Sequence, residues 1–393
     1  MPRNPLLPLS AVLLLTAASA CSYKETGEEN AAQAPAAEAD ALASNDDPNA
    51  TLPPEDRPRP LMQAQVVLDR LGFTPGVIDG KMGMSTVNAL KGFQEARGLP
   101  VTGELDQATQ QALAQWKHIP ATRVVTIPAD FANDQFVQIP KEREDQAKLP
   151  AMGYSSLGEK IAERFHTTEE VLAELNAAPA AAPAAPGAPQ GNEAAPQGDD
   201  AAPQANEAAP KPALAFRAGM QLRVPNIGAD KFDPSAVKDQ KWSNTLKLLG
   251  VGTEQPKAAK IEVDKSDQVL RVLDDQGKLL AQFTATMGSS QFPLPLGTWK
   301  IQGVGYNPPW QYDPKLLANA DKNDPKLEIP PGPNNPIGVV WIDLSKEHYG
   351  IHGTDEPSRI GRAESNGCIR LTNWDAARLA QMVGSGVEAV FKA

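Results

Sequence analysis

Two stretches of low-complexity sequence limit what this chain of 393 residues can fold into. Residues 177–213 contain 16 Ala and 8 Pro, and they include the related strings NEAAPQ and NEAAP. Residues 22–60 are rich in Ala, Pro, Glu, Asp and Asn and have almost no large apolar side chains. Segments of this composition cannot bury enough apolar surface to offset the entropy that they lose on ordering. The chain is therefore predicted to form separate folded modules joined by disordered tethers.

The acidic charge is concentrated in the same stretches. The formal net charge is −11, of which residues 21–60 contribute −6 and residues 177–213 contribute −3. The folded modules are therefore nearly neutral, and no basic stripe indicates binding to nucleic acid. The hydrophobic content of 41% is enough for ordinary cores, but 37 prolines are too many for one compact fold.

Met1–Ala20 has the anatomy of a secretory signal peptide. It carries one positive charge at Arg3, an apolar run over residues 6–18 and a small-residue end, Ala-Ser-Ala. The apolar run is too short to span a bilayer comfortably. We therefore predict that the protein is exported to an oxidising compartment.

Cys21 follows this segment directly. The string ASAC at 18–21 resembles a bacterial lipobox, in which the cysteine is acylated and becomes the mature N-terminus, although Leu is more usual than Ala18. The resemblance implies a lipid-anchored periplasmic protein with residues 21–58 as its tether, and Ser22 in place of Asp favours the outer membrane. The alternative is ordinary cleavage near residue 20, with Cys21 incidental.

Residues 59–118 are predicted to form the first module. Apolar residues at helical spacing indicate one helix, and two more are expected after a Gly-rich turn, with Ser85 and Asp106 as their caps. The string GVIDGKMGMSTVNALKGFQEARGLPVTGELDQATQQAL resembles the small three-helix peptidoglycan-binding domain. The resemblance implies attachment to the cell wall, and the alternative is a module that only packs on its neighbour. His118 is expected at the surface, because no second ligand-type residue is spaced for a metal.

Residues 134–227 contain a second pattern. Ser155–Asn176 is predicted to form two amphipathic helices, with Thr167 or Thr168 capping the second helix and Glu170 placed for a capping box.

Two short strands are expected around these helices, at Phe136–Pro140 and within Phe216–Ile227. The four segments resemble a LysM domain, a βααβ glycan-binding module, interrupted by residues 177–213. Each doubling of loop length costs only ~0.6 kcal/mol, so a small domain tolerates such an insertion. The alternative is that residues 177–213 are a plain linker and the resemblance is partial. His166 is expected in a loop or at a helix end.

Residues 258–393 are predicted to form a third, mostly β module of the sandwich or barrel type. Asp274–Gly277 is a strong hairpin turn, only Asp375–Val383 is clearly helical, and the Pro-rich residues 307–336 are expected to wall or cover a site. Strands are expected at Lys260–Asp264, Val269–Asp274, Lys278–Met287, Gly297–Gln302 and Val339–Asp343.

The chemistry of this module is expected at one thiol and one imidazole. Cys368 follows His352 by sixteen residues, and Gly367 beside it permits a tight backbone turn. A free thiol is only slightly ionised at neutral pH, so it needs a base or a cation to act as a nucleophile. His352 lies at a predicted strand end, whereas His348 is expected in a surface turn. The alternative is a buried, inert cysteine.

The pattern IHGT…GRAESNGCIRL resembles the L,D-transpeptidase catalytic domain, also called the YkuD domain, and the similarity extends over about residues 258–393. The resemblance implies that Cys368 is the nucleophile and that His352 is the base and later the acid. Gly353 would supply neighbouring backbone, and Ser365, Asn366 and Gly367 would shape the loop that presents the thiol. Asn366 stands where the family often has a second histidine, and an amide cannot titrate.

The implied reaction is acyl transfer on peptidoglycan stem peptides. The thiolate attacks the carbonyl before a terminal D-Ala, backbone N–H groups of Gly367 and Cys368 stabilise the oxyanion, and the thioester passes to an amine. That amine belongs to a second stem, a wall-anchored lipoprotein or a D-amino acid. Water as acceptor would make the protein a carboxypeptidase or endopeptidase, and a silent site would leave a wall-binding anchor.

Arg370 is expected to bind a substrate carboxylate, because alternate residues of an extended strand share a face with each other. The alternative is a structural ion pair with Asp355 or Glu364. The sequence contains no metal-ligand cluster and no nucleotide-binding loop, so no cofactor is expected.

Overall fold

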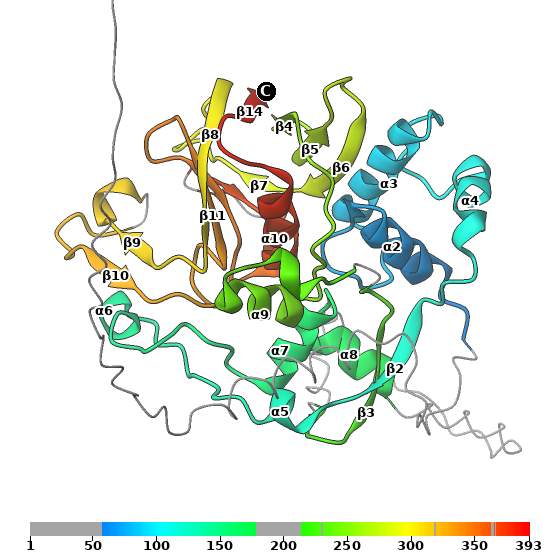
Figure 1. Ribbon diagram of the computed structural model, residues 1–393, viewed down its shortest axis with the longest axis horizontal. Helices are drawn as coiled ribbons and strands as arrows, with labels where there is room; N and C mark the ends of the chain where they lie inside the picture. The colour runs from blue at the N-terminus through cyan, green and yellow to red at the C-terminus, as the bar shows by residue number, and fades with distance from the viewer. Residues whose placement is uncertain (1–56, 178–213, 229–230, 318–319, 363–364, 366) are drawn as a thin grey trace, which may run out of the picture.

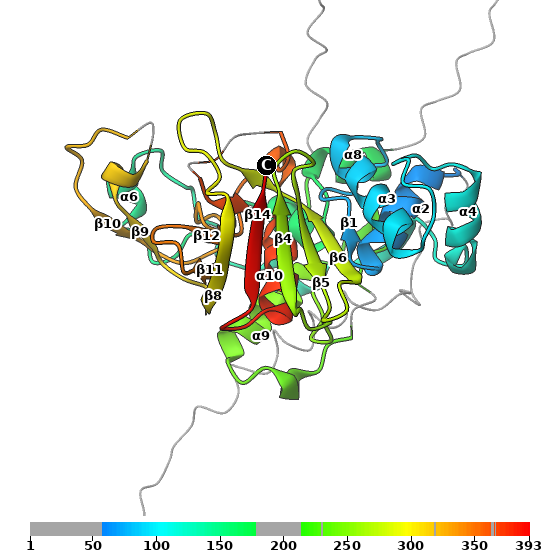
Figure 2. The ribbon, with the colours of Figure 1, turned by 90° about the horizontal axis from the view of Figure 1, so that it is seen from above.

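The computed structural model describes residues 57–177, 214–228, 231–317, 320–362, 365 and 367–393 (Figures 1 and 2). The predicted signal peptide, Cys21, most of its tether, most of the Ala/Pro-rich insertion, Glu364 and Asn366 lie outside the described residues. Within the described residues, no helix combines the length and the apolar composition needed to cross a bilayer.

The first module consists of short helices around a small apolar core. Leu68, Leu90 and Phe93 are fully buried in it. The Asp106 carboxylate accepts a hydrogen bond of 2.8 Å from the Thr109 N–H and caps α4, as predicted. Ser85 is not a cap, because α3 begins one residue earlier, after the extended Gly83. The elements are α2 (Pro60–Arg70), β1 (Phe73–Thr74), α3 (Met84–Ala96), α4 (Gln107–Leu113) and η1 (Ala114–Trp116).

The second module pairs two distant strands around two helices. Strands β2 (Thr122–Thr126) and β3 (Gln221–Pro225) are antiparallel, and helices α7 (Leu157–Arg164) and α8 (Glu169–Asn176) lie between them in sequence. The strand expected at Phe136–Pro140 is wrong. The first strand of the module is instead β2, so the module begins before the predicted residue 134, and Phe136, which is 36% exposed, lies outside the described strands.

The helix caps of this module follow the sequence only in part. Thr168 caps α8 by accepting a hydrogen bond from the Val171 N–H. Glu170 is therefore not at the position of a capping box, which lies three residues after the cap. Two further short helices, α5 (Ala129–Ala132) and α6 (Arg143–Gln146), occupy the long connection before α7.

The third module is built on a sheet of ten strands in the order β1-β6-β5-β4-β14-β8-β11-β12-β13-β7. Strands β6 and β7 lie near opposite ends of this order, yet only Ala285 separates them in the chain. The sheet must therefore curl towards closure, which confirms the mostly β, barrel-like expectation. The strands are β4 (Lys260–Asp264), β5 (Val269–Leu273), β6 (Leu279–Thr284), β7 (Thr286–Met287), β8 (Gly297–Tyr306), β11 (Val340–Leu344), β12 (Gly350–His352), β13 (Ile369–Arg370) and β14 (Glu388–Lys392).

Helices α10 (Asn373–Met382) and α9 (Gln240–Leu249) pack against this sheet and against each other (Figure 1). The Trp374 side chain of α10 is fully buried in the core, together with Ile342 and Phe283 from the sheet. Helix α10 begins two residues before the predicted Asp375, because the Thr372 side chain caps it. The Pro-rich segment forms a separate hairpin of β9 (Trp310–Tyr312) and β10 (Leu327–Ile329). Three single-turn helices, η2 (Pro234–Ala236), η3 (Pro314–Leu316) and η4 (Pro357–Arg359), complete the described elements.

The first and third modules share one β-sheet. Strand β1 of the first module extends the third module's sheet by pairing in parallel with β6, with Phe73 opposite Gln282 (Figure 2). The sequence did not predict this pairing, because two residues are too few to give a strand pattern.

A buried ionic cluster joins all three modules. Asp69 of α2 accepts hydrogen bonds from the Arg378 guanidinium of α10 at 2.9 and 3.0 Å. His166, from the connection between α7 and α8, contacts the same carboxylate at 3.2 Å and stacks on Trp374 at 4.8 Å between ring centroids. His166 lies in the turn after α7, as expected, and its side chain is buried between the modules. A charged cluster without solvent requires these three elements to fold against one another.

Candidate active site

The predicted thiol and imidazole lie on one cavity of about 500 Å³. Strand β12 ends at His352, and strand β13 begins immediately after Cys368. The two strands are adjacent and parallel, with His352 opposite Arg370, and the His352, Cys368 and Arg370 side chains line the same cavity. The cavity is lined by Arg143, Pro308, Pro309, Trp310, Gln311, Asp313, Leu316, Leu317, Pro336, Ile337, Trp341, His348, His352, Cys368 and Arg370.

The His352 ring is held in one tautomer. Its Nδ1 lies 2.7 Å from the Gly353 carbonyl oxygen, and a carbonyl only accepts, so Nδ1 carries the proton. The unprotonated Nε2 is then the base. The Trp341 indole stacks on the imidazole, with ring centroids 5.5 Å apart and an interplanar angle of 18°, and fixes its plane. Gly353 thus supplies the neighbouring backbone that the resemblance implies.

The imidazole is neutral when the site is at rest. Burial and, to a smaller extent, the nearby Arg370 charge lower the pKa of His352 to about 3, and the hydrogen bond to the Gly353 carbonyl opposes them. A neutral imidazole is able to accept a proton from the thiol at physiological pH.

The thiol is also neutral at rest. Burial raises the pKa of Cys368, although the backbone N–H of Gly350 and the charge of Arg370 act in the opposite direction. Its Sγ lies 3.9 Å from the His348 carbonyl oxygen. Because both partners are uncharged, deprotonation of the sulfur must accompany its attack on a substrate carbonyl. The histidine at 348 has a half-exposed side chain in a left-handed turn, as predicted, but it also lines the cavity.

Ser365 organises the loop that presents the thiol. Its Oγ donates to the Cys368 carbonyl at 2.6 Å and accepts from the N–H groups of Gly288 and Gly367 at 2.7 and 3.2 Å. Gly367 has a φ of +101°, and a Cβ there would lie 2.7 Å from the Tyr349 ring, so only glycine fits. The Gly367 N–H is thus engaged by Ser365 in this arrangement, and its part in an oxyanion site stays a prediction, as does that of the Cys368 N–H.

Arg370 contributes a positive charge to the cavity. Burial raises the pKa of Asp355 and the Arg370 charge opposes that rise, so these two groups interact electrostatically. No ion pair within 4 Å joins them in the described residues, and Glu364 lies outside those residues. The described residues also hold no group of three His, Cys, Asp or Glu side chains placed for a metal ion.

Sequence reasoning missed the part that the second module plays in this site. Arg143 of α6 lines the cavity, and its guanidinium lies 5.2 Å from the centre of the Trp310 ring. Figures 1 and 2 both show α6 beside the β9–β10 hairpin. No signal in the sequence connects Arg143 with a cysteine more than two hundred residues away.

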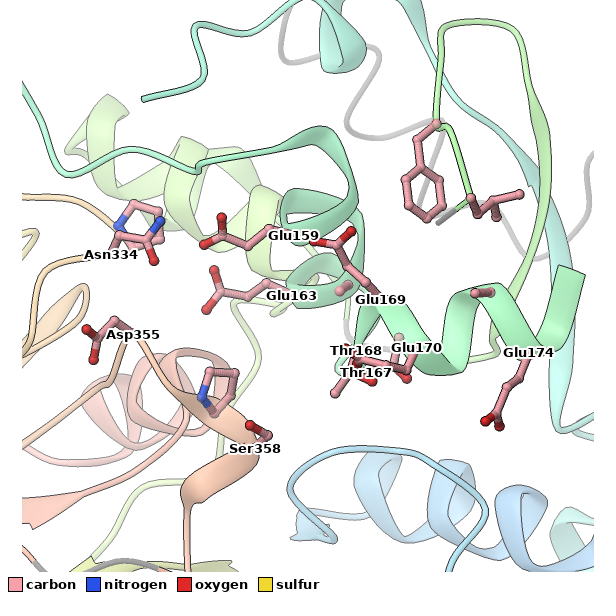
Figure 3. Close-up of a pocket in the computed structure, with 16 residues that line it drawn as sticks. Glu159, Glu163, Thr167, Thr168, Glu169, Glu170, Glu174, Asn334, Asp355 and Ser358 are labelled. Atoms are coloured by element: carbon pink, nitrogen blue, oxygen red, sulfur yellow. The ribbon is translucent and has the colours of Figure 1, made fainter. Parts of the chain in front are cut away.

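A second cavity, of about 630 Å³, lies between helices α7 and α8 and the turn that follows His352 (Figure 3). Glu163 of α7 faces Asp355 across it. The Glu163 carboxylate accepts a hydrogen bond of 2.7 Å from the side-chain amide of Asn373, whose oxygen in turn accepts from the Val339 N–H at 3.2 Å. A Cβ on Gly353 would lie 2.2 Å from that amide oxygen, so Asn373 packs directly against the backbone that orients His352.

Comparison with known proteins gives two domain matches. Residues 258–391 match the L,D-transpeptidase catalytic domain, and residues 59–113 match a peptidoglycan-binding domain.

Individual relatives match different shares of the chain. It is 55% identical over 56 residues to the YkuD L,D-transpeptidase of Bacillus licheniformis, which covers 14% of this chain and 34% of the relative. It is 30% identical over 186 residues to an L,D-transpeptidase from the ATP synthase subunits region of Fuscovulum blasticum, covering 45% of this chain and 93% of that protein. The chain thus spans about a third of the first relative.

A solved L,D-transpeptidase from Mycobacterium smegmatis aligns with 34% of this chain and 58% of its own, at 23% identity and a TM-score of 0.28.

Proposed function

The chain belongs to the L,D-transpeptidase family, and on that premise we propose that it is a cysteine acyltransferase acting on the stem peptides of peptidoglycan. The observation that carries the proposal is the shared cavity of Cys368 and His352, together with the Nδ1–Gly353 hydrogen bond of 2.7 Å. That hydrogen bond keeps the proton on Nδ1, so Nε2 is unprotonated and can accept a proton as a base.

The reaction proceeds in two transfers. His352 Nε2 takes the thiol proton as the Cys368 sulfur attacks the carbonyl before the terminal D-Ala of a tetrapeptide. The C–N bond breaks, and the imidazolium returns its proton to the leaving D-Ala amine, which leaves a thioester. An acceptor amine then attacks the thioester, its proton passes to His352, and the thiol is regenerated when the new amide forms.

The other modules are proposed to hold the enzyme at the wall. The first module is proposed to be a peptidoglycan-binding domain of the three-helix type. The order β2-α7-α8-β3, with β2 and β3 antiparallel, supports a LysM-like glycan-binding module interrupted by residues 177–213. Lipidation of Cys21, a periplasmic location and attachment to the outer membrane are proposed from the sequence of residues 18–22.

Two measurements test the proposal. A carbapenem is expected to add its mass to the wild-type protein and not to a Cys368→Ala variant, because acylation requires an activated thiol. Absence of the adduct in wild type, or its persistence in the variant, would favour a wall-binding anchor.

Incubation with a disaccharide-tetrapeptide, followed by mass spectrometry, identifies the acceptor. Crosslinked dimers, D-amino-acid exchange and attachment to a lipoprotein lysine each indicate a transferase. Free tripeptide alone would show that water is the acceptor and that the protein is an L,D-carboxypeptidase.

A further inference from the structure

The charges around the thiol favour a substrate with more than one carboxylate. Two arginines, Arg143 and Arg370, line the cavity, and Asp313 is the one carboxylate among its described lining residues. The Asp313 carboxylate already pairs with the Lys326 ammonium at 2.6 Å. The cavity therefore presents an excess of positive charge, which attracts anionic ligands.

The two arginines occupy different parts of the cavity. Arg370 follows Cys368 by two residues and lies opposite His352 in register, which places it beside the reacting atoms. Arg143 lies on the wall formed by the β9–β10 hairpin, with its guanidinium over the Trp310 ring at 5.2 Å.

Arg143 is held in place but keeps hydrogen-bonding capacity. Its Nη1 donates to Gln146 Oε1 at 2.6 Å, and Gln146, which is 5% exposed, donates to the Pro140 carbonyl at 2.7 Å. The Asp355 carboxylate interacts electrostatically with Arg143 but does not line the cavity. The Arg143 guanidinium over the Trp310 ring has N–H donors besides the one that Gln146 accepts, which suits bidentate binding of a carboxylate.

The segment that carries Arg143 is fastened to the third module. The Met152 N–H donates to the Pro331 carbonyl at 2.9 Å, and the Asn334 N–H donates to the Met152 carbonyl at 3.0 Å. A Cβ on Gly332 would lie 2.1 Å from the Met152 carbonyl oxygen, so the two backbones are in close contact. This attachment gives Arg143 a fixed position relative to Cys368.

We propose that Arg143 binds a side-chain carboxylate of the acyl-donor peptide, while Arg370 binds the carboxylate of its terminal residue. The inference rests on the proposed function and adds one binding residue to it: Arg143 contacts the side-chain carboxylate of the donor's third residue where that residue carries one. The second module thereby takes part in substrate selection, through a residue outside the matched catalytic domain.

The test compares two tetrapeptide donors that differ in one group. In one donor the third residue is diaminopimelate with a free side-chain carboxylate, and in the other that carboxylate is a carboxamide. Both keep the terminal D-Ala carboxylate. Loss of one charge-assisted hydrogen-bonded pair is expected to lower kcat/KM of the wild-type protein about tenfold for the amidated donor.

The Arg143→Met variant removes the charge while a flexible side chain still covers Trp310. It is expected to reduce the preference to about twofold, because kcat/KM falls mainly for the donor with the free carboxylate. Arg143→Lys is expected to keep part of the preference, because an ammonium pairs without the bidentate geometry. Arg359→Met, at an exposed arginine paired with Glu356, serves as the matched control and should keep the full preference.

The results separate this inference from the proposed function. Turnover of both donors by wild type without a preference, or an equal loss on both donors in Arg143→Met, overturns the role of Arg143 and leaves the enzyme reading intact. Alkylation of Cys368 by neutral iodoacetamide at the wild-type rate shows that the variant's site is folded. Turnover of neither donor by wild type overturns the proposed function and this inference with it.

Discussion

Replacing Asp69 with asparagine is expected to destabilise all three modules together. In the folded protein the Asp69 carboxylate accepts two hydrogen bonds from Arg378, at 2.9 and 3.0 Å, and one from His166 at 3.2 Å. The side chains are at most 3% exposed. The variant removes the closer of two carboxylates beside the buried Arg378 guanidinium and leaves Asp375, at 4.0 Å. Breaking a buried pair typically costs 3–5 kcal/mol, so we expect a loss at the lower end of that range, about 3 kcal/mol.

The assay is thermal and urea unfolding of the full chain at neutral pH, followed by near-ultraviolet circular dichroism. At ~2–4 °C per kcal/mol, the midpoint is expected to fall by about 10 °C. Asp145→Asn is the control, because Asp145 pairs with Lys148 at 2.7 Å on the exposed surface, where solvent screens the interaction and its loss should leave the midpoint nearly unchanged.

The stability that the Asp69 carboxylate contributes depends on pH. Burial acts to raise the pKa of Asp69, but the charges of Arg378 and His166 outweigh it and hold that pKa well below its usual range. The stabilisation is therefore complete at neutral pH, and it is lost as the pH falls below about 4 towards the folded-state pKa. The stability gap between wild type and Asp69→Asn should narrow over that acidic range.

Two results would refute the reasoning. One is a stability of Asp69→Asn within 1 kcal/mol of wild type at neutral pH, no different from the surface control. The other is separate unfolding of the modules in wild type, with only one of several transitions sensitive to Asp69.

The remaining predictions concern the site and the second cavity. Burial raises the pKa of Cys368 and lowers that of His352, so the thiol is neutral at rest. The rate of its alkylation by iodoacetamide should therefore keep rising from about pH 6 to pH 9. A plateau of that rate below pH 7 would mean that the thiol is already ionised at rest. His352→Ala should slow carbapenem acylation about 10²–10⁴-fold without altering the circular dichroism, and acylation at the wild-type rate would exclude it as the base. Burial raises the pKa of Glu163 to about 7, so wild-type stability should decline as the pH rises from about 4.5 through 7. Glu163→Gln should show a smaller decline than wild type, because only Asp375, whose pKa burial raises to about 6, and less buried carboxyls still contribute to it. The exposed Glu170→Gln should decline as wild type does; an equal change of the urea midpoint between pH 5 and pH 8 in wild type and Glu163→Gln would contradict the prediction.

The sequence by itself determined the local features of this protein. The hairpin turn at Asp274–Gly277, the cap at Asp106 and the position of Cys368 and His352 on one cavity all depend on nearby residues or on a short, specific motif. The Ala/Pro-rich composition of residues 177–213 likewise showed, without a structure, that this stretch cannot form a core.

Only the tertiary structure decided how the modules meet. The pairing of β1 with β6, the burial of His166 against Asp69, and the placement of Arg143 beside the catalytic cavity all join residues that are distant in the chain. Such contacts depend on which surfaces remain after each module has folded. A polar residue destined for a buried junction has the same local pattern as one destined for solvent, because hydrophobic periodicity reports the core of its own element and not the neighbour that covers its polar face.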